Sequence, residues 1–312
     1  MLNQIKWLGF VVSSAFAVSA FGQAVGFATL PPGSLNHTTA SAVSKVLSEK
    51  AGMNMLVQPT AGDNVIIPMV NRGESLMGIA NAPETAMAIH EAKQANVRLL
   101  SVAHTLQTAF FVRKDSTLKT IADMKGKRVA LGYSAMRTID LLTRAMLATA
   151  GMTERDVQAV RVPNVVRSAD DFASGAADMF FFAFGGPKVR EVDASIPLRV
   201  LEIDEKGMAA ARKVTPYGFL TQVAPGPIFI GVEKPMKVYS FDNLFLIDAK
   251  ASDEVAYKIL DTLEKNRADL AAIQPVLRAF TATNGYKQYD IPYHPGALKY
   301  YKEHNIQAKP LE

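Results

Sequence analysis

The sequence contains no cysteine among its 312 residues. An exported protein without cysteine has no disulfide framework, so its folded state must depend on a hydrophobic core. The absence also removes the lipid-modified cysteine that tethers many exported proteins of cells without an outer membrane. The hydrophobic fraction of 49% is sufficient for a core, and the length allows two domains of roughly 100–150 residues each.

The sequence also has no strong excess of charge of one sign. Its net charge is +5, from 34 basic and 29 acidic residues that are spread along the chain. No basic block with interleaved aromatic residues occurs, so we expect no nucleic-acid partner.

The sequence motifs of common catalytic sites are missing as well. The segment His90-Glu-Ala-Lys-Gln lacks the second histidine of a zinc-binding helix, and the five histidines are scattered. Neither a Gly-x-Ser-x-Gly nucleophile turn nor a Gly-Lys-Ser/Thr phosphate loop occurs. We therefore expect a protein that is not an enzyme and that uses neither a metal nor a cofactor.

The one long apolar run without charge lies at the N-terminus. It covers residues 7–20 and follows Lys6. A membrane-spanning helix needs ~20 apolar residues, so the run is too short to span and is typical of a secretory signal. Small residues at Val18-Ser-Ala20 and Gly22-Gln-Ala24 suit cleavage. We predict a cleaved signal peptide at residues 1–24 and a periplasmic protein; an uncleaved anchor is the alternative.

Beyond residue 24, short apolar runs alternate with helical patterns. Because strand, turn and helix repeat, the pattern predicts an α/β fold with mainly parallel, doubly wound sheets. Apolar positions at helical spacing between residues 40 and 51, ended by Gly52, show the pattern clearly. The expected strands cover residues 25–29, 54–58, 77–80, 97–102, 108–113, 128–131, 157–162, 179–182, 198–203 and 228–232.

Two of these strands divide the chain into two lobes. We expect the chain to leave lobe I near Phe111 and to return near Phe229. Lobe I then comprises residues 25–110 and 229–312, and lobe II comprises residues 111–228. Lobes joined by paired strands can close around a ligand in the cleft between them.

In open α/β sheets, ligands bind beyond the carboxyl ends of the strands. Five strand-to-helix turns there are rich in Gly, Ser, Thr and Asn, and free N–H groups at helix N-termini favour anions. Helix capping alone explains any single turn, whereas five in series favour a ligand. The candidate ligand-binding residues are Thr29, Ser34, Asn36, Thr60, Asp63, Asn64, Asn81, Tyr133, Ser134, Arg137, Thr138, Phe184, Gly185 and Tyr217.

Arg137 is unusual because it is a cation in the first turn of an expected helix, where it opposes the helix dipole. A bound carboxylate would offset this cost and could accept two bonds from the guanidinium. Extension into solvent or an ion pair with Asp140 is the other explanation, and the sequence favours neither.

The order of several motifs resembles the TAXI-type solute receptors of TRAP (tripartite ATP-independent periplasmic) transporters. The matching segments are Thr60-Ala-Gly-Asp-Asn64, Asn71-Arg-Gly-Glu74, Val112-Arg-Lys-Asp-Ser116, Ile121–Gly132, Gly175-Ala-Ala-Asp178, Phe184-Gly-Gly-Pro187 and His294–Tyr301. Together they span nearly the whole chain beyond the predicted signal. Two ligand-facing turns, Leu30-Pro-Pro-Gly-Ser-Leu35 and Ala135-Met-Arg-Thr138, depart from the family pattern.

The resemblance implies a periplasmic-binding-protein-like fold of type II. It also implies a monomeric receptor that delivers a small organic anion, a carboxylate or amino acid, to TRAP permease subunits. A receptor of a tripartite tricarboxylate transporter or of an ATP-driven importer would share the architecture. Alternatives of other classes are an enzyme of the thiamine-pyrimidine synthesis type and an interaction protein without a ligand.

Overall fold

The computed structural model describes residues 24–215 and 217–311. The predicted signal peptide lies outside these residues, apart from Ala24. Within the described part of the chain, no helix is long and apolar enough to span a membrane.

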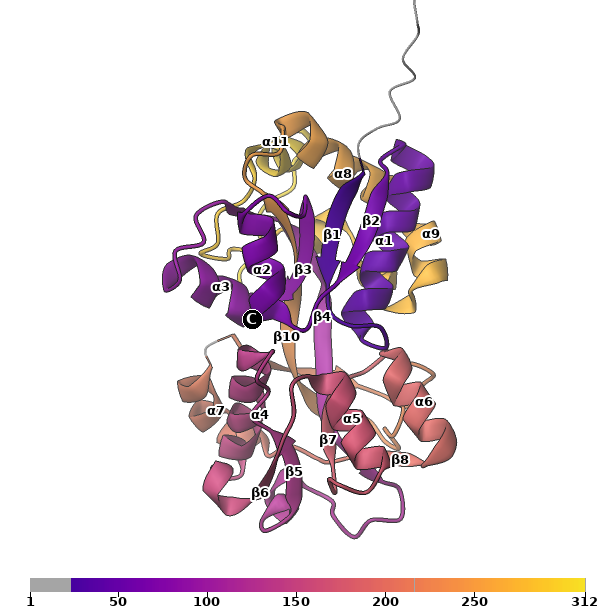
Figure 1. Cartoon of the computed structure of the whole chain (residues 1–312), viewed down its shortest axis with the longest axis vertical. Coiled ribbons are helices and arrows are strands. Elements are labelled where there is room, and N and C mark those ends of the chain that lie inside the picture. Colours follow the sequence, from indigo (N-terminus) through magenta and orange to yellow (C-terminus); the bar gives the residue numbers. More distant parts are fainter. Residues whose placement is uncertain (1–23, 216, 312) are drawn as a thin grey trace, which may run out of the picture.

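The described chain forms two α/β lobes, one above the other in Figure 1. Lobe I contains the first three strands and helices together with the C-terminal helices. Its elements are β1 (Val25–Thr29), α1 (Leu35–Ala51), β2 (Met55–Pro59), α2 (Asp63–Asn71), β3 (Met77–Asn81), α3 (Ala82–His90), α8 (Asp253–Lys265), α9 (Arg267–Ile273), α10 (Ala282–Gly285) and α11 (Pro295–Glu303).

Lobe II contains the middle of the chain. Its elements are β5 (Arg128–Leu131), α4 (Arg137–Thr149), β6 (Gln158–Arg161), α5 (Val165–Ala173), β7 (Phe180–Ala183), α6 (Pro187–Ser195), β8 (Leu198–Val200), α7 (Met208–Val214) and β9 (Phe219–Val223). Short 3-10 turns lie between some of them, for example at Ile121–Met124.

Two long strands connect the lobes. β4 (Val97–Arg113) and β10 (Met236–Asp248) pair antiparallel, from Val97 opposite Asp248 to Thr108 opposite Tyr239. The main sheet has the order β2-β1-β3-β10-β4-β7, and β1 is parallel to both β2 and β3. Because β4 and β10 pass through both lobes, they form the hinge (Figure 1).

Local sequence explains the helices of lobe I. Ser34 caps α1 by accepting a bond from the His37 N–H (3.1 Å), and Gly52 ends the helix with a φ of 65°, a conformation that glycine adopts at little cost. Asn81 likewise caps α3 by accepting from the Glu84 N–H (2.8 Å). These caps set the first turns of both helices at the carboxyl ends of β1 and β3.

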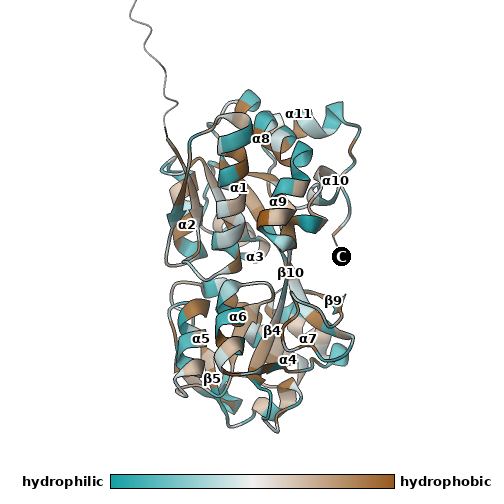
Figure 2. Ribbon diagram, turned by 90° about the vertical axis from the view of Figure 1, so that its right-hand side faces the viewer, coloured by the Kyte–Doolittle hydropathy of each residue, from teal (hydrophilic) through white to brown (hydrophobic). Residues whose placement is uncertain are grey.

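Apolar side chains fill the space between sheet and helices in both lobes, and the helices carry hydrophilic residues on their outward faces (Figure 2). In lobe II, aromatic rings dominate this core: Phe111 stacks on Phe180 at 5.2 Å, and Phe110 meets Phe181 edge-on at 5.7 Å. Burial of each such ring contributes about 1.5–3 kcal/mol to the stability of the fold.

The fold class expected from the sequence is confirmed, but the strands that cross between the lobes differ from those expected. The expected strand at residues 228–232 is wrong: these residues lie in turns, after Pro225-Gly-Pro227. The chain returns to lobe I along β10. The two strands expected at 97–102 and 108–113 are one strand, β4, because residues 103–107 continue the ladder opposite β10.

Candidate functional site

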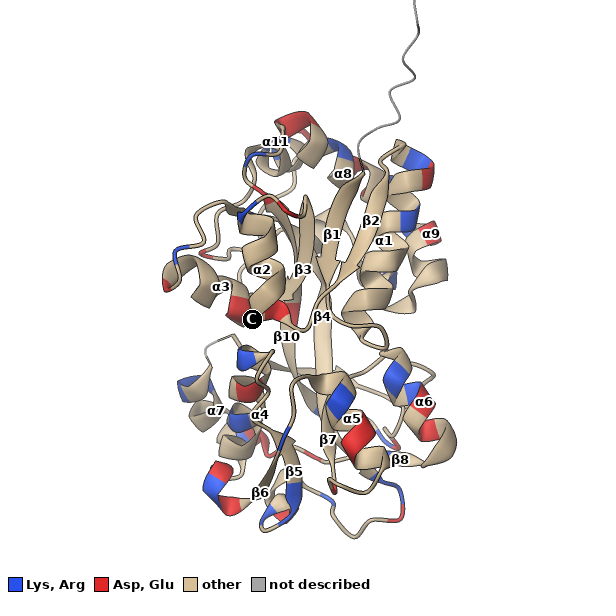
Figure 3. Ribbon diagram, in the orientation of Figure 1, with Lys and Arg blue, Asp and Glu red and all other residues tan. Residues whose placement is uncertain are grey.

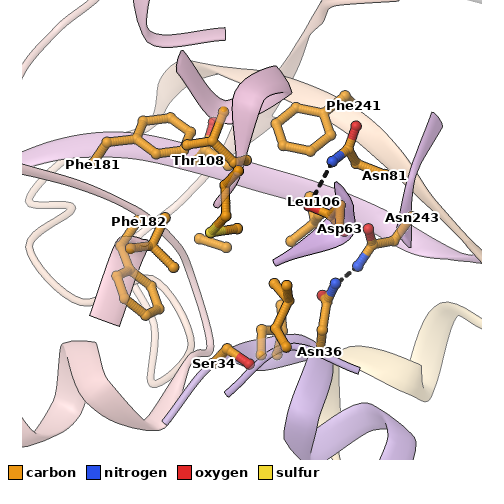
Figure 4. Close-up of a pocket in the computed structure, with 16 residues that line it drawn as sticks. Ser34, Asn36, Asp63, Asn81, Leu106, Thr108, Phe181, Phe182, Phe241 and Asn243 are labelled. Atoms are coloured by element: carbon orange, nitrogen blue, oxygen red, sulfur yellow. Dashed lines mark hydrogen bonds between the residues drawn. The ribbon is translucent and has the colours of Figure 1, made fainter. Parts of the chain in front are cut away.

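The site lies where the lobes meet. Strands β1 and β3 end there, helices α1, α2 and α3 begin there, and β4 and β10 pass beside them; α4, α5 and β7 contribute from lobe II. These elements enclose a cavity of about 40 Å³ (Figure 4). Its lining comprises Leu30, Ser34, Leu35, Asn36, Asp63, Asn81, Leu106, Thr108, Met136, Ile139, Val165, Phe181, Phe182, Ala183, Phe241 and Asn243.

Two hydrogen-bonded pairs form the polar wall of the cavity. Asp63 Oδ2 accepts a bond from Asn81 Nδ2 at 2.9 Å, and Asn36 Oδ1 accepts one from Asn243 Nδ2 (Figure 4). Within residues 24–215 and 217–311, the other carboxylate oxygen of Asp63 and the side-chain oxygen of Asn243 have no partner. Since Asp63 is 2% exposed and Asn243 is 0% exposed, each of these two lining residues carries a buried acceptor without a donor.

The environment of Asp63 disfavours its charge. Burial, and then repulsion from Glu84, raise the pKa of this carboxyl from 3.8 to about 7, against the opposing effect of the Asn81 hydrogen bond. The carboxyl therefore exchanges its proton near neutral pH, and a donor or cation beside it would favour the ionised form.

The rest of the lining is apolar except for Ser34 and Thr108, whose hydroxyls donate to the backbone carbonyls of Pro31 and Tyr239. It includes the rings of Phe181 and Phe182 from β7 and of Phe241 from β10 (Figure 4). Among the described residues that line the cavity, none is Lys, Arg or His, and Asp63 is the one ionisable side chain. Charged residues elsewhere lie mainly on the outer helices, apart from acidic segments at the starts of α2 and α3 and a basic one at the start of α4 (Figure 3).

The two lobes contact each other around the cavity. Glu84, in the first turn of α3, accepts hydrogen bonds from the backbone N–H (3.1 Å) and the hydroxyl of Thr138, in the first turn of α4. A lobe I carboxylate therefore occupies the positive end of α4, as the helix dipole favours. Close contact also requires Gly62, because a Cβ there would lie 1.6 Å from the Ala135 carbonyl oxygen of lobe II.

The structure divides the residues predicted from the sequence into four groups. Ser34, Asn36, Asp63 and Asn81 line the cavity. A second hollow of about 420 Å³ is lined in part by Asn64, Tyr133, Ser134, Arg137 and Asp140. Thr138 is buried and makes the interlobe contact with Glu84.

Arg137 is exposed beside this second hollow. Its expected alternative partner, Asp140, instead accepts bonds from the Gly132 N–H (2.7 Å) and from Arg144 (2.8 Å). The structure therefore brings Arg137 close to the lobe boundary but does not place it on the lining of the small cavity.

The remaining predicted residues line neither the cavity nor the second hollow. Thr29 is buried at the end of β1, and the Thr60 hydroxyl donates to the Gly62 carbonyl at 3.2 Å. Phe184 packs its ring against Phe111 and Phe229, and Gly185 adopts a φ of 79° in the turn after β7. Tyr217 donates to Asp290 at 3.1 Å.

Sequence reasoning missed the residues that the hinge strands contribute, notably Thr108, Phe241 and Asn243. One signal was present. Asp242 and Asn243 interrupt an otherwise apolar and β-branched run, and buried polar residues within a strand need a specific partner. The sequence does not show which strand-to-helix turn that partner occupies.

The two-lobed α/β fold with two hinge strands is that of periplasmic binding proteins. Residues 27–304 match the model of the NMT1-like family, and the chain belongs to this family.

Solved structures share the fold at low sequence identity. One is a periplasmic transporter, with a TM-score of 0.61 and 13% identity over 90% of this chain and 92% of that one. Another is PhnD1 from Prochlorococcus marinus in complex with methylphosphonate, with a TM-score of 0.57 and 11% identity over 91% of this chain and 99% of that one. A third is the substrate-binding protein of an amino acid ABC transporter, with a TM-score of 0.51 and 12% identity over 80% and 96% of the two chains.

Proposed function

We propose that the protein is a periplasmic solute-binding receptor whose lobes close on a small molecule and present it to a membrane importer. The observation that carries the proposal is the interlobe cavity, in which both lobes and both hinge strands contribute lining residues. A buried wall with two acceptors lacking donors is costly unless a ligand or water satisfies it, at about 1–3 kcal/mol per group.

The cavity and the hinge together support ligand-dependent closure. A volume of about 40 Å³ accommodates a head group or a few water molecules, since about 10–15 Å³ is needed for one water. A larger solute would require the lobes to move apart, and β4 and β10 are the connections about which they would move.

The importer is proposed to be an ion-driven TRAP permease, because the motif order resembles receptors of that class. An ATP-driven importer is the alternative, supported by the fold that the chain shares with the substrate-binding protein of an amino acid ABC transporter. Crosslinking of the exported receptor in intact cells, followed by identification of the attached membrane protein, would distinguish the two.

Native mass spectrometry tests the receptor function. Protein released from the periplasm without denaturation should carry a small molecule whose mass is lost under denaturing conditions. Ala183→Leu adds bulk to the cavity lining and should lose this molecule, whereas Ala159→Leu, a half-buried alanine on β6, should retain it. If no bound mass appears with the wild-type protein, or if Ala183→Leu retains it in full, the cavity is not the solute site.

A further inference from the structure

We propose that the interlobe cavity receives the head group of a small organic cation, an amine or ammonium compound with a compact apolar body. This inference rests on the receptor function proposed above and names its ligand class. It departs from the organic anion expected from the sequence.

The first argument is the charge and the hydrogen-bonding character of the lining. Asp63 is its one ionisable residue, and the free oxygens of Asp63 and Asn243 are both acceptors. An ammonium group has three donors and no acceptor, so it could satisfy both oxygens. A carboxylate has only acceptors, so it would leave both oxygens without donors and would meet the like charge of Asp63.

The second argument is the aromatic part of the lining. The side chains of Phe181, Phe182 and Phe241 line the same cavity as Asp63 (Figure 4). An aromatic ring attracts a cation that lies over its face through its quadrupole, and it excludes water from an apolar body at the same time. Leu106, Met136 and other aliphatic side chains complete a surface suited to hydrocarbon.

The third argument concerns the nearest alternative site for an anion. The N-terminus of α4 already has a carboxylate partner, because Glu84 accepts bonds from both the backbone and the hydroxyl of Thr138. A ligand carboxylate could bind there only by displacing Glu84. Arg137 lines the second hollow, and the same lining includes the carboxylates of Glu84 and Asp140, which would disfavour an anion there.

The pH dependence of binding reports the sign of the ligand charge. A cation favours the ionised form of Asp63. Because the pKa of this carboxyl is about 7, its ionised fraction rises about tenfold from pH 6 to pH 8, and the affinity for a cation should rise by the same factor. An anion would show the opposite trend. Glu84 is the charged group whose repulsion acts on Asp63, and His104 remains neutral over this range because burial lowers its pKa to about 4. Other titratable groups on elements packed against α2 are His90, Arg98, Arg113, Lys237, Tyr239, Asp242 and Asp248.

Calorimetric titration of the mature protein with three probes tests the proposal. Isobutylamine, isobutanol and isovalerate share an isobutyl body and carry a positive, a neutral and a negative head. We expect isobutylamine to bind at least about tenfold more tightly than isovalerate at pH 8, a difference of about 1.4 kcal/mol or more. Asp63→Asn should remove this preference and the pH dependence. The control Asp171→Asn, at a carboxylate 8% exposed on α5 and paired with Arg167, should retain both.

The outcomes separate this inference from the receptor function. The inference of an amine ligand would be overturned if isobutanol or isovalerate bound as tightly as isobutylamine or more tightly. Unchanged isobutylamine affinity in Asp63→Asn would overturn it as well. The pH trend of the wild-type protein gives the same test without a variant. Absence of binding by all three probes would also overturn the inference, and the native mass spectrum would then decide the receptor function separately.

Discussion

Asp63 should make the protein less stable at neutral pH than an uncharged residue of the same shape would. Its carboxyl is buried at the lobe boundary, and burial and Glu84 raise its pKa from 3.8 to about 7. The folded protein therefore binds this proton more tightly than the unfolded chain does. The stability that the proton contributes is complete below about pH 4 and is lost as the pH rises to about 7.

The substitution Asp63→Asn removes the titration and retains the shape. The asparagine oxygen can still accept the bond from Asn81, which spans 2.9 Å in the native pair. A pKa difference of about three units corresponds to about 4 kcal/mol, which is an upper limit because the surroundings of a buried charge relax. We expect the variant to be more stable than the wild-type protein by about 1–4 kcal/mol at about pH 8, and about equally stable at about pH 4.

Urea unfolding followed by circular dichroism at several pH values measures this difference. The comparison is between two proteins at each pH, so titrations common to both, including that of His104, cancel. Asp171→Asn is the control: its carboxylate is paired with Arg167 at 2.9 Å, so no gain in stability with rising pH is expected. A stability difference between Asp63→Asn and the wild type that does not change with pH would refute the reasoning.

Three further substitutions test other parts of the account. Glu84→Gln weakens the contact with Thr138 at the lobe boundary, so small-angle scattering without added solute should show a larger radius of gyration than for the wild type. An unchanged scattering profile would mean that this contact does not hold the lobes together. Lys287→Met leaves the buried carboxylate of Asp242 without its ion-pair partner at 2.6 Å, so the free energy of unfolding in urea near neutral pH should fall by about 3–5 kcal/mol. A fall below about 1 kcal/mol would contradict a buried pair. Arg137→Ala should change isobutylamine affinity less than about threefold in calorimetry, whereas a loss of isovalerate affinity of about thirtyfold or more in this variant would favour the anion hypothesis drawn from the sequence.

The sequence predicted the α/β fold and most elements of both lobes, because each element carries its own local signals. Ser34 and Asn81 are caps with short polar side chains, and Gly52 ends α1 in a left-handed conformation. Such signals depend on a few adjacent residues, so periodicity and composition are sufficient to recognise them. The long strand β10 carries no turn signal of this kind, and its polar centre at Asp242 and Asn243 concealed its continuity.

The candidate site was less accessible to sequence reasoning. The principle that ligands bind beyond the carboxyl ends of parallel strands correctly directed attention to residues such as Asn36 and Asp63, which line the cavity. Their partners depend on tertiary structure. Asn243 donates a hydrogen bond to Asn36, which lies 207 residues earlier in the sequence. Glu84 of lobe I caps the N-terminus of α4 in lobe II. No local pattern encodes these pairings, and whether the predicted residues bind a ligand stays a prediction.

The most direct test of the central claim is the distance between the two lobes with and without solute. Because the sequence has no cysteine, Lys45→Cys on α1 and Arg190→Cys on α6, both exposed, can carry a unique pair of spin labels. Pulsed dipolar spectroscopy would compare protein purified without denaturation, together with any solute that copurifies, to the same protein after unfolding, dialysis and refolding. The account predicts a single short distance in the first sample and an additional longer distance in the second. Identical distance distributions in both samples would contradict a receptor that closes on its solute.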